Sequence, residues 1–232
     1  MIASLTSYSL QDFIPFTAEV YLRMLERMNE NDWPLHVLMY ALTLFSVIQA
    51  LGTHRHRTFA MLSLSLIWLW VAVSFLYQSY AQINWAATWF AAAFGFEALL
   101  LVWMAIRSPE AASSPPRFVR TIALLIAALA MAWPVFSPVG RSSWAQCESV
   151  GIHADPSAVL TLGILLLLFS GWRLWLLTLI PILWCIVSML TLKVLGLDQF
   201  MVLMGILVIG FAAMIRASRV SQDCIRNTRE SR

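Results

Sequence analysis

Glu97 is the one charged side chain in the middle of an apolar run that is long enough to cross a membrane. The run extends from Trp85 to Ile106, and its sequence is WAATWFAAAFGFEALLLVWMAI. An ionisable group at the centre of a bilayer costs about 2.5–3.5 kcal/mol on insertion scales, so it usually faces other helices or a water-filled cavity. We therefore expect Glu97 to relay a proton or a cation, or else to hydrogen-bond a neighbouring helix as a neutral carboxyl.

Three other side chains are candidate partners for the Glu97 carboxyl. Tyr40 and His36 lie in the first apolar run, and Lys193 is the only lysine of the chain. Because Lys193 lies near the end of its run, it is expected to extend outward to the membrane surface instead. Pro181 interrupts the backbone hydrogen bonds of the same run and is a possible hinge, although packing kinks also occur at proline.

A second group of polar residues lies in the longest connection, Ser137 to Ser157. It contains Cys147, His153 and Asp155, together with Glu148. The first three are candidate metal ligands, but a cysteine and a histidine six residues apart, without a second thiol, do not have a known zinc spacing. We expect a polar loop at this position and predict no cofactor.

Enzyme motifs are absent from the sequence. It contains no HExxH, GxSxG, GxxxxGK[ST] or CxxC, and the apolar runs contain no pair of acids. A catalytic function is therefore not predicted, and an enzyme acting on a lipid or quinone ranks third among the hypotheses. The net charge of +3 does not indicate nucleic-acid binding, because the basic residues lie between the apolar runs.

The composition predicts an all-α integral membrane protein. Hydrophobic residues make up 60% of the 232 residues, charged residues only 12%, and the mean hydropathy is +0.77. A transmembrane helix needs about 20 mostly apolar residues. Seven runs are candidates for a bundle of about seven transmembrane helices: Trp33–Leu51, Thr58–Gln78, Trp85–Ile106, Val119–Phe136, Ala158–Gly171, Leu174–Leu195 and Phe200–Ile215.

The remaining parts of the chain flank this bundle, which we place at residues 33–216. Residues 1–32 do not resemble a signal peptide, and from Thr17 they are typical of an amphipathic helix on the membrane surface. Residues 217–232 form a basic tail. Eleven of the fifteen Lys and Arg residues lie on the side of the tail, so the positive-inside rule predicts a cytoplasmic C-terminus and an external N-terminus.

Several stretches resemble one known family. They are FTAEVYLRMLERMNENDWP from Phe16, INWAATWFAAAF from Ile83, TLGILLLL from Thr161, and IPILWCIVSMLTLKVLGLDQFMVLMGIL from Ile180. They are similar to a family of small bacterial polytopic membrane proteins of unknown function. Its members tend to carry Pro-Cys-Pro before the Thr-Leu-Gly segment, whereas this chain has HADPSAVLTLG. The resemblance implies a helical fold and a bacterial inner membrane, and it implies no activity.

Two functional hypotheses follow from the sequence. The first is a non-catalytic membrane subunit or accessory protein that binds a protein partner, or a second copy of itself, within the lipid bilayer. It is favoured because the spans contain few polar groups and little of the chain lies outside them. The alternative is a small transporter or channel for a proton, a cation or a small solute, with Glu97 at its centre.

Overall fold

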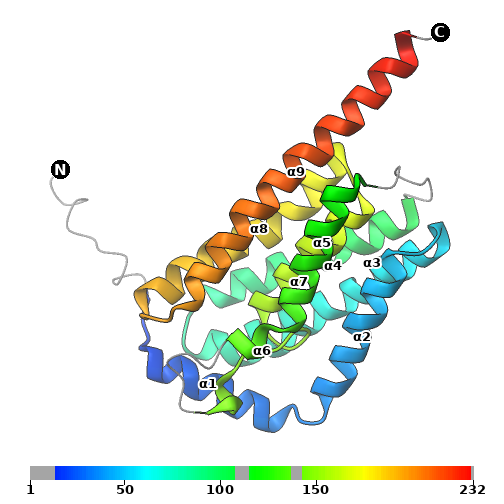
Figure 1. The fold of residues 1–232 in the computed structure, drawn as a ribbon. Helices are drawn as coiled ribbons and strands as arrows, with labels where there is room; N and C mark the ends of the chain where they lie inside the picture. Colours follow the sequence, from blue (N-terminus) through cyan, green and yellow to red (C-terminus); the bar gives the residue numbers. More distant parts are fainter. Residues whose placement is uncertain (1–13, 108–114, 137–142, 231–232) are drawn as a thin grey trace, which may run out of the picture.

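Helix α7 (Ala154–Leu168) lies at the centre of an all-helical bundle, and every one of its 15 residues is buried. The computed structural model describes residues 14–107, 115–136 and 143–230, and these ranges contain no strand. Figure 1 shows the other long helices arranged around α7. In chain order they are α2 (Leu35–Ala50), α3 (His54–Trp70) with its continuation η3 (Val71–Ser79) and η4 (Tyr80–Gln82), α4 (Ala87–Arg107), α5 (Arg117–Met131), α8 (Gly171–Val194) and α9 (Gln199–Glu230).

Four helical segments are long and apolar enough to cross a membrane: Arg55–Gln82, Ala87–Arg107, Gly171–Val194 and Gln199–Val220. A fifth candidate is the pair formed by α1 (Ala18–Asn31) and α2, whose axes meet at 90°. Helix α7 is apolar but short, since 15 residues span only about 22 Å of a hydrocarbon core of about 30 Å. The helical membrane fold therefore agrees with the sequence, while the count of seven crossings stays a prediction.

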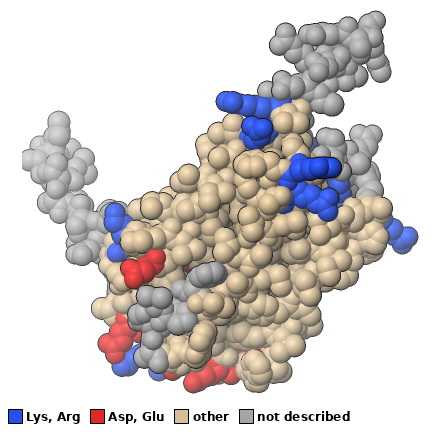
Figure 2. Space-filling view, viewed as in Figure 1, with Lys and Arg blue, Asp and Glu red and all other residues tan. Residues whose placement is uncertain are grey.

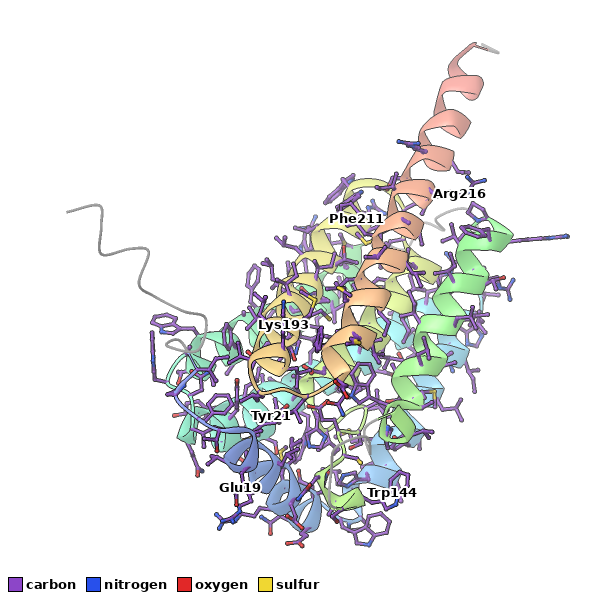
Figure 3. The ribbon with its side chains drawn as sticks, turned by 60° about the vertical axis from the view of Figure 1, so that its left-hand side comes forward. Glu19, Tyr21, Trp144, Lys193, Phe211 and Arg216 are labelled. Atoms are coloured by element: carbon purple, nitrogen blue, oxygen red, sulfur yellow. The ribbon has the colours of Figure 1, made fainter. Side chains whose placement is uncertain are left out.

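Helix α1 is the amphipathic helix that the sequence predicts. Thr17 caps it by accepting a hydrogen bond from the backbone of Val20, and Tyr21, Leu25 and Met28 are buried against the bundle. In Figure 3, α1 crosses one end of the bundle, with Tyr21 toward the interior and Glu19 on the outer side. The helix thus covers the end of the bundle at which α3, α5 and α8 finish.

Close packing holds α7 against α5. Gly163 lies at the contact, where a methyl group in place of its hydrogen would come within 2.7 Å of the carbonyl oxygen of Ala123. Small residues on α5, including Ala123 and Ala127, allow this approach. Van der Waals packing of this kind is a main source of helix association in membranes, because lipid removes the hydrophobic driving force.

Charge is divided between the two ends of the bundle. Eight arginines with described side chains lie at what we call the arginine end: Arg55, Arg57, Arg107, Arg117, Arg120, Arg173, Arg216 and Arg219. The opposite end, here the α1 end, has the acids of α1, with Arg23 and Arg27. Figure 2 shows a broad uncharged belt between blue patches at the top and red patches at the bottom. Arg141, on the α1 side in the sequence count, lies outside the described residues.

Candidate functional site

The connection before α7 is buried inside the α1 end of the bundle. Gln146 to His153 are all buried, so the polar loop that the sequence predicts here lies inside the protein. Helix α1 lies over this segment and is bonded to it, because the Asn29 side-chain amide donates to the carbonyl oxygens of Ala145 and Cys147 at 2.6 and 2.9 Å. The backbone amides and carbonyls of a buried segment need such partners.

Glu148 is 1% exposed and accepts hydrogen bonds from two neutral donors. The Tyr21 hydroxyl donates to its Oε1 at 2.5 Å, and the indole Nε1 of Trp133 donates to its Oε2 at 2.9 Å. Trp133 begins the short helix α6 (Trp133–Phe136). Burial, and then the neighbouring Glu148 charge, raises the pKa of Tyr21 well above its usual value. Tyr21 therefore keeps its proton and remains a donor to this carboxylate.

Asp155 is a second buried carboxylate, 2% exposed, in the first turn of α7. The Nε1 of Trp184 donates to its Oδ1 at 2.8 Å, and the Ser188 hydroxyl donates to its Oδ2 at 2.5 Å. Trp184 and Ser188 are four residues apart on α8, so they occupy one face of that helix. The positive end of the α7 dipole also favours a negative charge at this position.

His153 lies between the two carboxylates in sequence and is fully buried. Its Nδ1 accepts a hydrogen bond of 2.9 Å from the backbone N–H of Ser149. In the neutral ring this places the proton on Nε2. The ring also meets Phe75 edge to face at 5.5 Å between centroids. The α1 end thus contains a group of buried ionisable side chains together with the neutral donors that bond them. We call it the buried acid cluster: Tyr21, Trp133, Glu148, His153, Asp155, Trp184 and Ser188.

A small cavity is lined by hydrogen-bond donors of both carboxylates. Its volume is about 10 Å³, and the residues that line it include Tyr21, Tyr80, Trp184, Ser188 and Thr191, which all carry a polar side-chain group. This volume is close to the minimum that one water molecule requires, and a buried water needs two to four polar partners. Tyr21 donates to one carboxylate and Ser188 to the other. A water here would complete a hydrogen-bonded chain between them.

Glu97 is fully buried on α4, ten residues after the helix begins and therefore about 15 Å along it. Neither of its carboxyl oxygens has a hydrogen-bond partner among the described residues. Phe94, one turn earlier, meets Trp184 at 5.2 Å between ring centroids. Glu97 therefore lies one helical turn from Phe94, whose ring contacts Trp184, and Trp184 in turn donates a hydrogen bond to Asp155.

The other candidate relay residues lie elsewhere. The Nε2 of His36 is 2.8 Å from the side-chain oxygen of Asn29, and no hydrogen bond joins Glu97 to His36 or Tyr40 within the described part of the chain. His36 and Tyr40 instead line a groove of about 700 Å³ at the α1 end, whose lining includes the exposed Trp33. The structure therefore does not assemble these three residues into one site.

The remaining predicted residues have varied positions. Cys147, His153 and Asp155 are all buried at the α1 end, but no three His, Cys, Asp or Glu side chains among those described are arranged to hold a metal ion. Pro181 is buried within an uninterrupted α8, and its role as a hinge stays a prediction. Lys193 is exposed in the last turn of α8 (Figure 3).

Sequence reasoning missed most of the buried acid cluster. Glu148 was placed in a loop, and Tyr21, Trp133 and Trp184 were not among the candidate residues. One available signal was the Trp184–Ser188 pair, which places two hydrogen-bond donors on one face of an apolar helix. The other was the loop sequence itself, where Val150 and Ile152 alternate with polar residues and are both buried.

The comparisons with known proteins give a family and no activity. A family model described as a family of unknown function, DUF6064, matches residues 18–223. No curated protein and no solved structure matches the chain. The matched region runs from the start of α1 almost to the end of α9 and includes the whole buried acid cluster. The chain therefore belongs to the family of unknown function DUF6064.

Proposed function

We propose that this protein is a small membrane transporter or channel that moves protons, or a solute together with protons, through its buried carboxyl groups. The observation that carries the proposal is the cavity lined by Tyr21 and Ser188, which are hydrogen-bond donors of Glu148 and Asp155. A carboxyl that can exchange its proton through hydroxyls and water is the usual component of a proton relay in membrane proteins.

Three carboxyl groups, those of Glu97, Glu148 and Asp155, are buried inside one bundle. Transfer of an ionised carboxylate from water to a protein interior costs several kcal/mol even after relaxation. Glu148 and Asp155 recover part of this cost from neutral donors, while Glu97 has no such bond among the described residues. Hydrophobic residues at these sites would give a bundle without this cost. The carboxyls are therefore better explained by a role in transport than by stability.

The proposed path begins at the α1 end. Protons pass from Glu148 through Tyr21 and the small cavity to Ser188 and Asp155. Glu97 is the next carboxyl along the bundle, beyond the Trp184 and Phe94 rings. Rearrangement of these rings, or of α8 at Pro181, is required to connect it.

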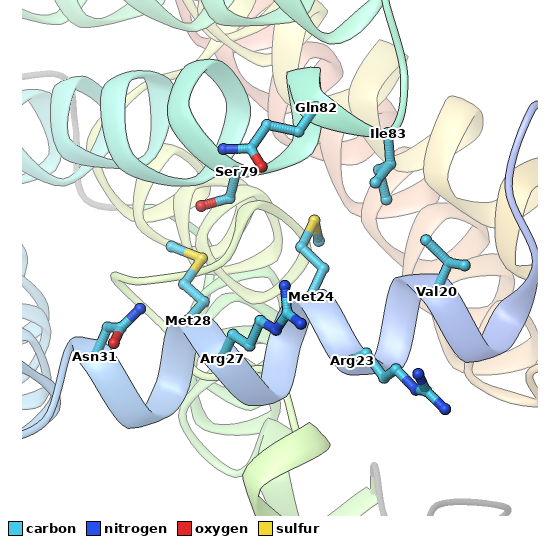
Figure 4. A pocket seen from close by; sticks show the side chains of 9 residues that line it. All are labelled: Val20, Arg23, Met24, Arg27, Met28, Asn31, Ser79, Gln82 and Ile83. Carbon is cyan, nitrogen blue, oxygen red and sulfur yellow. The ribbon is translucent and has the colours of Figure 1, made fainter.

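Water can approach this path from the cleft beside α1. The cleft has a volume of about 310 Å³ and lies between α1 and the end of η3 (Figure 4). Arg27 extends toward the cleft, and Ser79 and Gln82 form part of its other wall. Ser79 directly precedes Tyr80, which lines the small cavity. A modest displacement of α1 would join the cleft to the buried acid cluster.

We further propose the orientation and the location of the protein. The eight arginines of the arginine end favour a cytoplasmic position for that end by the positive-inside rule, which would leave α1 on the outer face. Seven crossings would put the two ends of the chain on opposite sides. The resemblance to bacterial proteins favours a bacterial inner membrane.

A second candidate function is a non-catalytic subunit of a larger membrane complex. It is favoured by α9, which continues past the bundle as a single projecting helix as far as Glu230 (Figure 1). Extraction from native membranes in mild detergent separates the two functions. A protein that co-migrates at fixed stoichiometry, with no proton flux from the purified chain, would favour the subunit.

The direct test is proton flux into vesicles that contain the purified protein and a pH-sensitive dye. After an external acid jump, we expect flux above that of empty vesicles, reduced at least tenfold by Asp155→Asn or Glu97→Gln. Glu30→Gln, a change at an exposed acid on α1, is the matched control and should leave the rate unchanged. Flux that equals the empty-vesicle rate, or that is indifferent to all of these changes, would refute the proposal.

A further inference from the structure

An apolar groove runs along the outside of the bundle between α7, α8 and α9. Its volume is about 450 Å³, and its lining is entirely apolar, with contributions from Leu162 and Leu166 of α7, Ile182 and Ile186 of α8, and residues 207–215 of α9. Val208 and Phe211 are 66% and 49% exposed. The groove therefore opens toward the surroundings of the bundle, at the depth of the membrane-spanning part of α9.

The end of the groove nearest the arginine end is bounded by positive charge. Arg219 follows Ile215 by four residues, which places it on the same face of α9, one turn beyond the groove. Arg216 is four residues beyond Ala212, another lining residue, and its guanidinium lies 5.7 Å from the ring of Phe118 on α5. Figure 3 shows Phe211 and Arg216 in this order along α9.

Helix α8 contributes an arginine and two tryptophans at the same level. Arg173 lies 5.8 Å from the ring of Trp172, and Trp172 is 63% exposed. Trp175 packs edge to face on Phe211, with 5.2 Å between centroids, and its Nε1 donates to Ser218 at 3.1 Å. Tryptophan is enriched at the headgroup level of bilayers. The bond between Trp175 and Ser218 fixes the separation of the two helices where the groove ends.

No acid with a described side chain lies at the arginine end, where the eight arginines give a field of one sign. Arginine binds phosphate oxygens through two parallel N–H donors, which makes it the side chain most suited to a phosphodiester. An apolar groove at membrane depth, with arginines beyond one end, fits a molecule with a hydrocarbon chain and an anionic head.

We propose that the α7–α8–α9 groove binds an anionic phospholipid, with an acyl chain along Leu166, Val208 and Phe211 and its phosphate at the level of Arg173 and Arg219. The charge at the end of the groove selects this occupant over a second copy of the chain, which would bring the same arginines together. The site is remote from the buried acid cluster, so it stands independently of the proposed proton transport.

The test uses the full-length protein in a neutral detergent, titrated with phosphatidylglycerol or with phosphatidylcholine of the same acyl chains. Binding is followed by native mass spectrometry. We expect wild-type protein to retain phosphatidylglycerol in preference to phosphatidylcholine. The double variant Arg173→Gln with Arg219→Gln should reduce that preference roughly tenfold, as expected for the loss of charge-assisted hydrogen bonds. Arg173→Lys with Arg219→Lys keeps the charge and should retain most of the preference.

Two further variants make the result specific. Arg55→Gln with Arg120→Gln removes the same charge from the same end, on helices that do not line the groove, and should leave the preference intact. Ala212→Phe fills the groove and should reduce binding of both lipids. An equal loss in both double-glutamine variants would show general surface attraction and overturn the proposal. Lipid-free protein that dimerises, and is made monomeric by Ala212→Phe, would also overturn it, in favour of a second copy.

Discussion

Tyr21→Phe removes one hydroxyl from the α1 end and leaves the rest of the side chain in place. The aromatic ring packs on Phe16 and Tyr80, with centroid distances of 6.2 and 6.3 Å, and phenylalanine retains both contacts. The hydroxyl donates to Glu148 at 2.5 Å in a buried setting. Hydrogen bonds to charged groups contribute about 1.5–3 kcal/mol, so the variant should lose about that much free energy of unfolding.

The measurement is a denaturant titration in detergent, with tryptophan fluorescence as the signal. Tyr40→Phe is the control, because Tyr40 is half-buried in the groove that includes Trp33, and the hydroxyl donors to Glu148 and Asp155 are Tyr21 and Ser188. The free energy of unfolding of Tyr40→Phe should differ from that of the wild type by no more than about 0.5 kcal/mol. Tyr21→Phe should also slow proton flux, since the hydroxyl links Glu148 to the small cavity. Equal stability and equal flux in the two variants would refute the assignment of Tyr21 as donor and relay.

Two further predictions concern packing and pH. Gly163→Ala should loosen the contact between α5 and α7 and lower the melting temperature, because its methyl group would come within 2.7 Å of the α5 backbone, whereas Gly205→Ala has open space and should be tolerated. Burial raises the pKa of Asp32, so the folded protein holds this proton more tightly than the unfolded chain does. The free energy of unfolding should therefore fall as the pH rises from the pKa of Asp32 in the unfolded chain to its raised pKa in the folded protein. Denaturant titrations at several pH values measure this dependence, and Asp32→Asn should reduce it.

The helices of this protein could be predicted from sequence, because long apolar runs with polar connections leave few alternatives in a membrane. The amphipathic helix from Thr17 was equally predictable, since its charged and apolar residues separate on two faces. Glu97 was also identified correctly as a buried acid, because it is the only charge at the centre of its run.

The buried acid cluster was not predictable in the same way. Its members come from α1, α6, α7, α8 and the segment before α7, and sequence spacing does not indicate which helices meet. The segment around Glu148 has the composition of a loop, and its burial depends on distant parts of the chain, including α1, whose Asn29 bonds its backbone. The pairing of Glu97 with His36 and Tyr40 was suggested by residue type alone, and the helix arrangement does not bring them into one site.

The most direct test of the account is infrared difference spectroscopy of the protein in lipid, recorded between acidic and alkaline buffer. Proton exchange by the buried carboxyls predicts carboxylic C=O bands that disappear as the groups ionise. One band should be lost in each of the variants Glu97→Gln, Glu148→Gln and Asp155→Asn. If all carboxyl bands of the wild type persist unchanged in these variants, the three groups do not exchange protons with solvent, and the proposed relay is wrong.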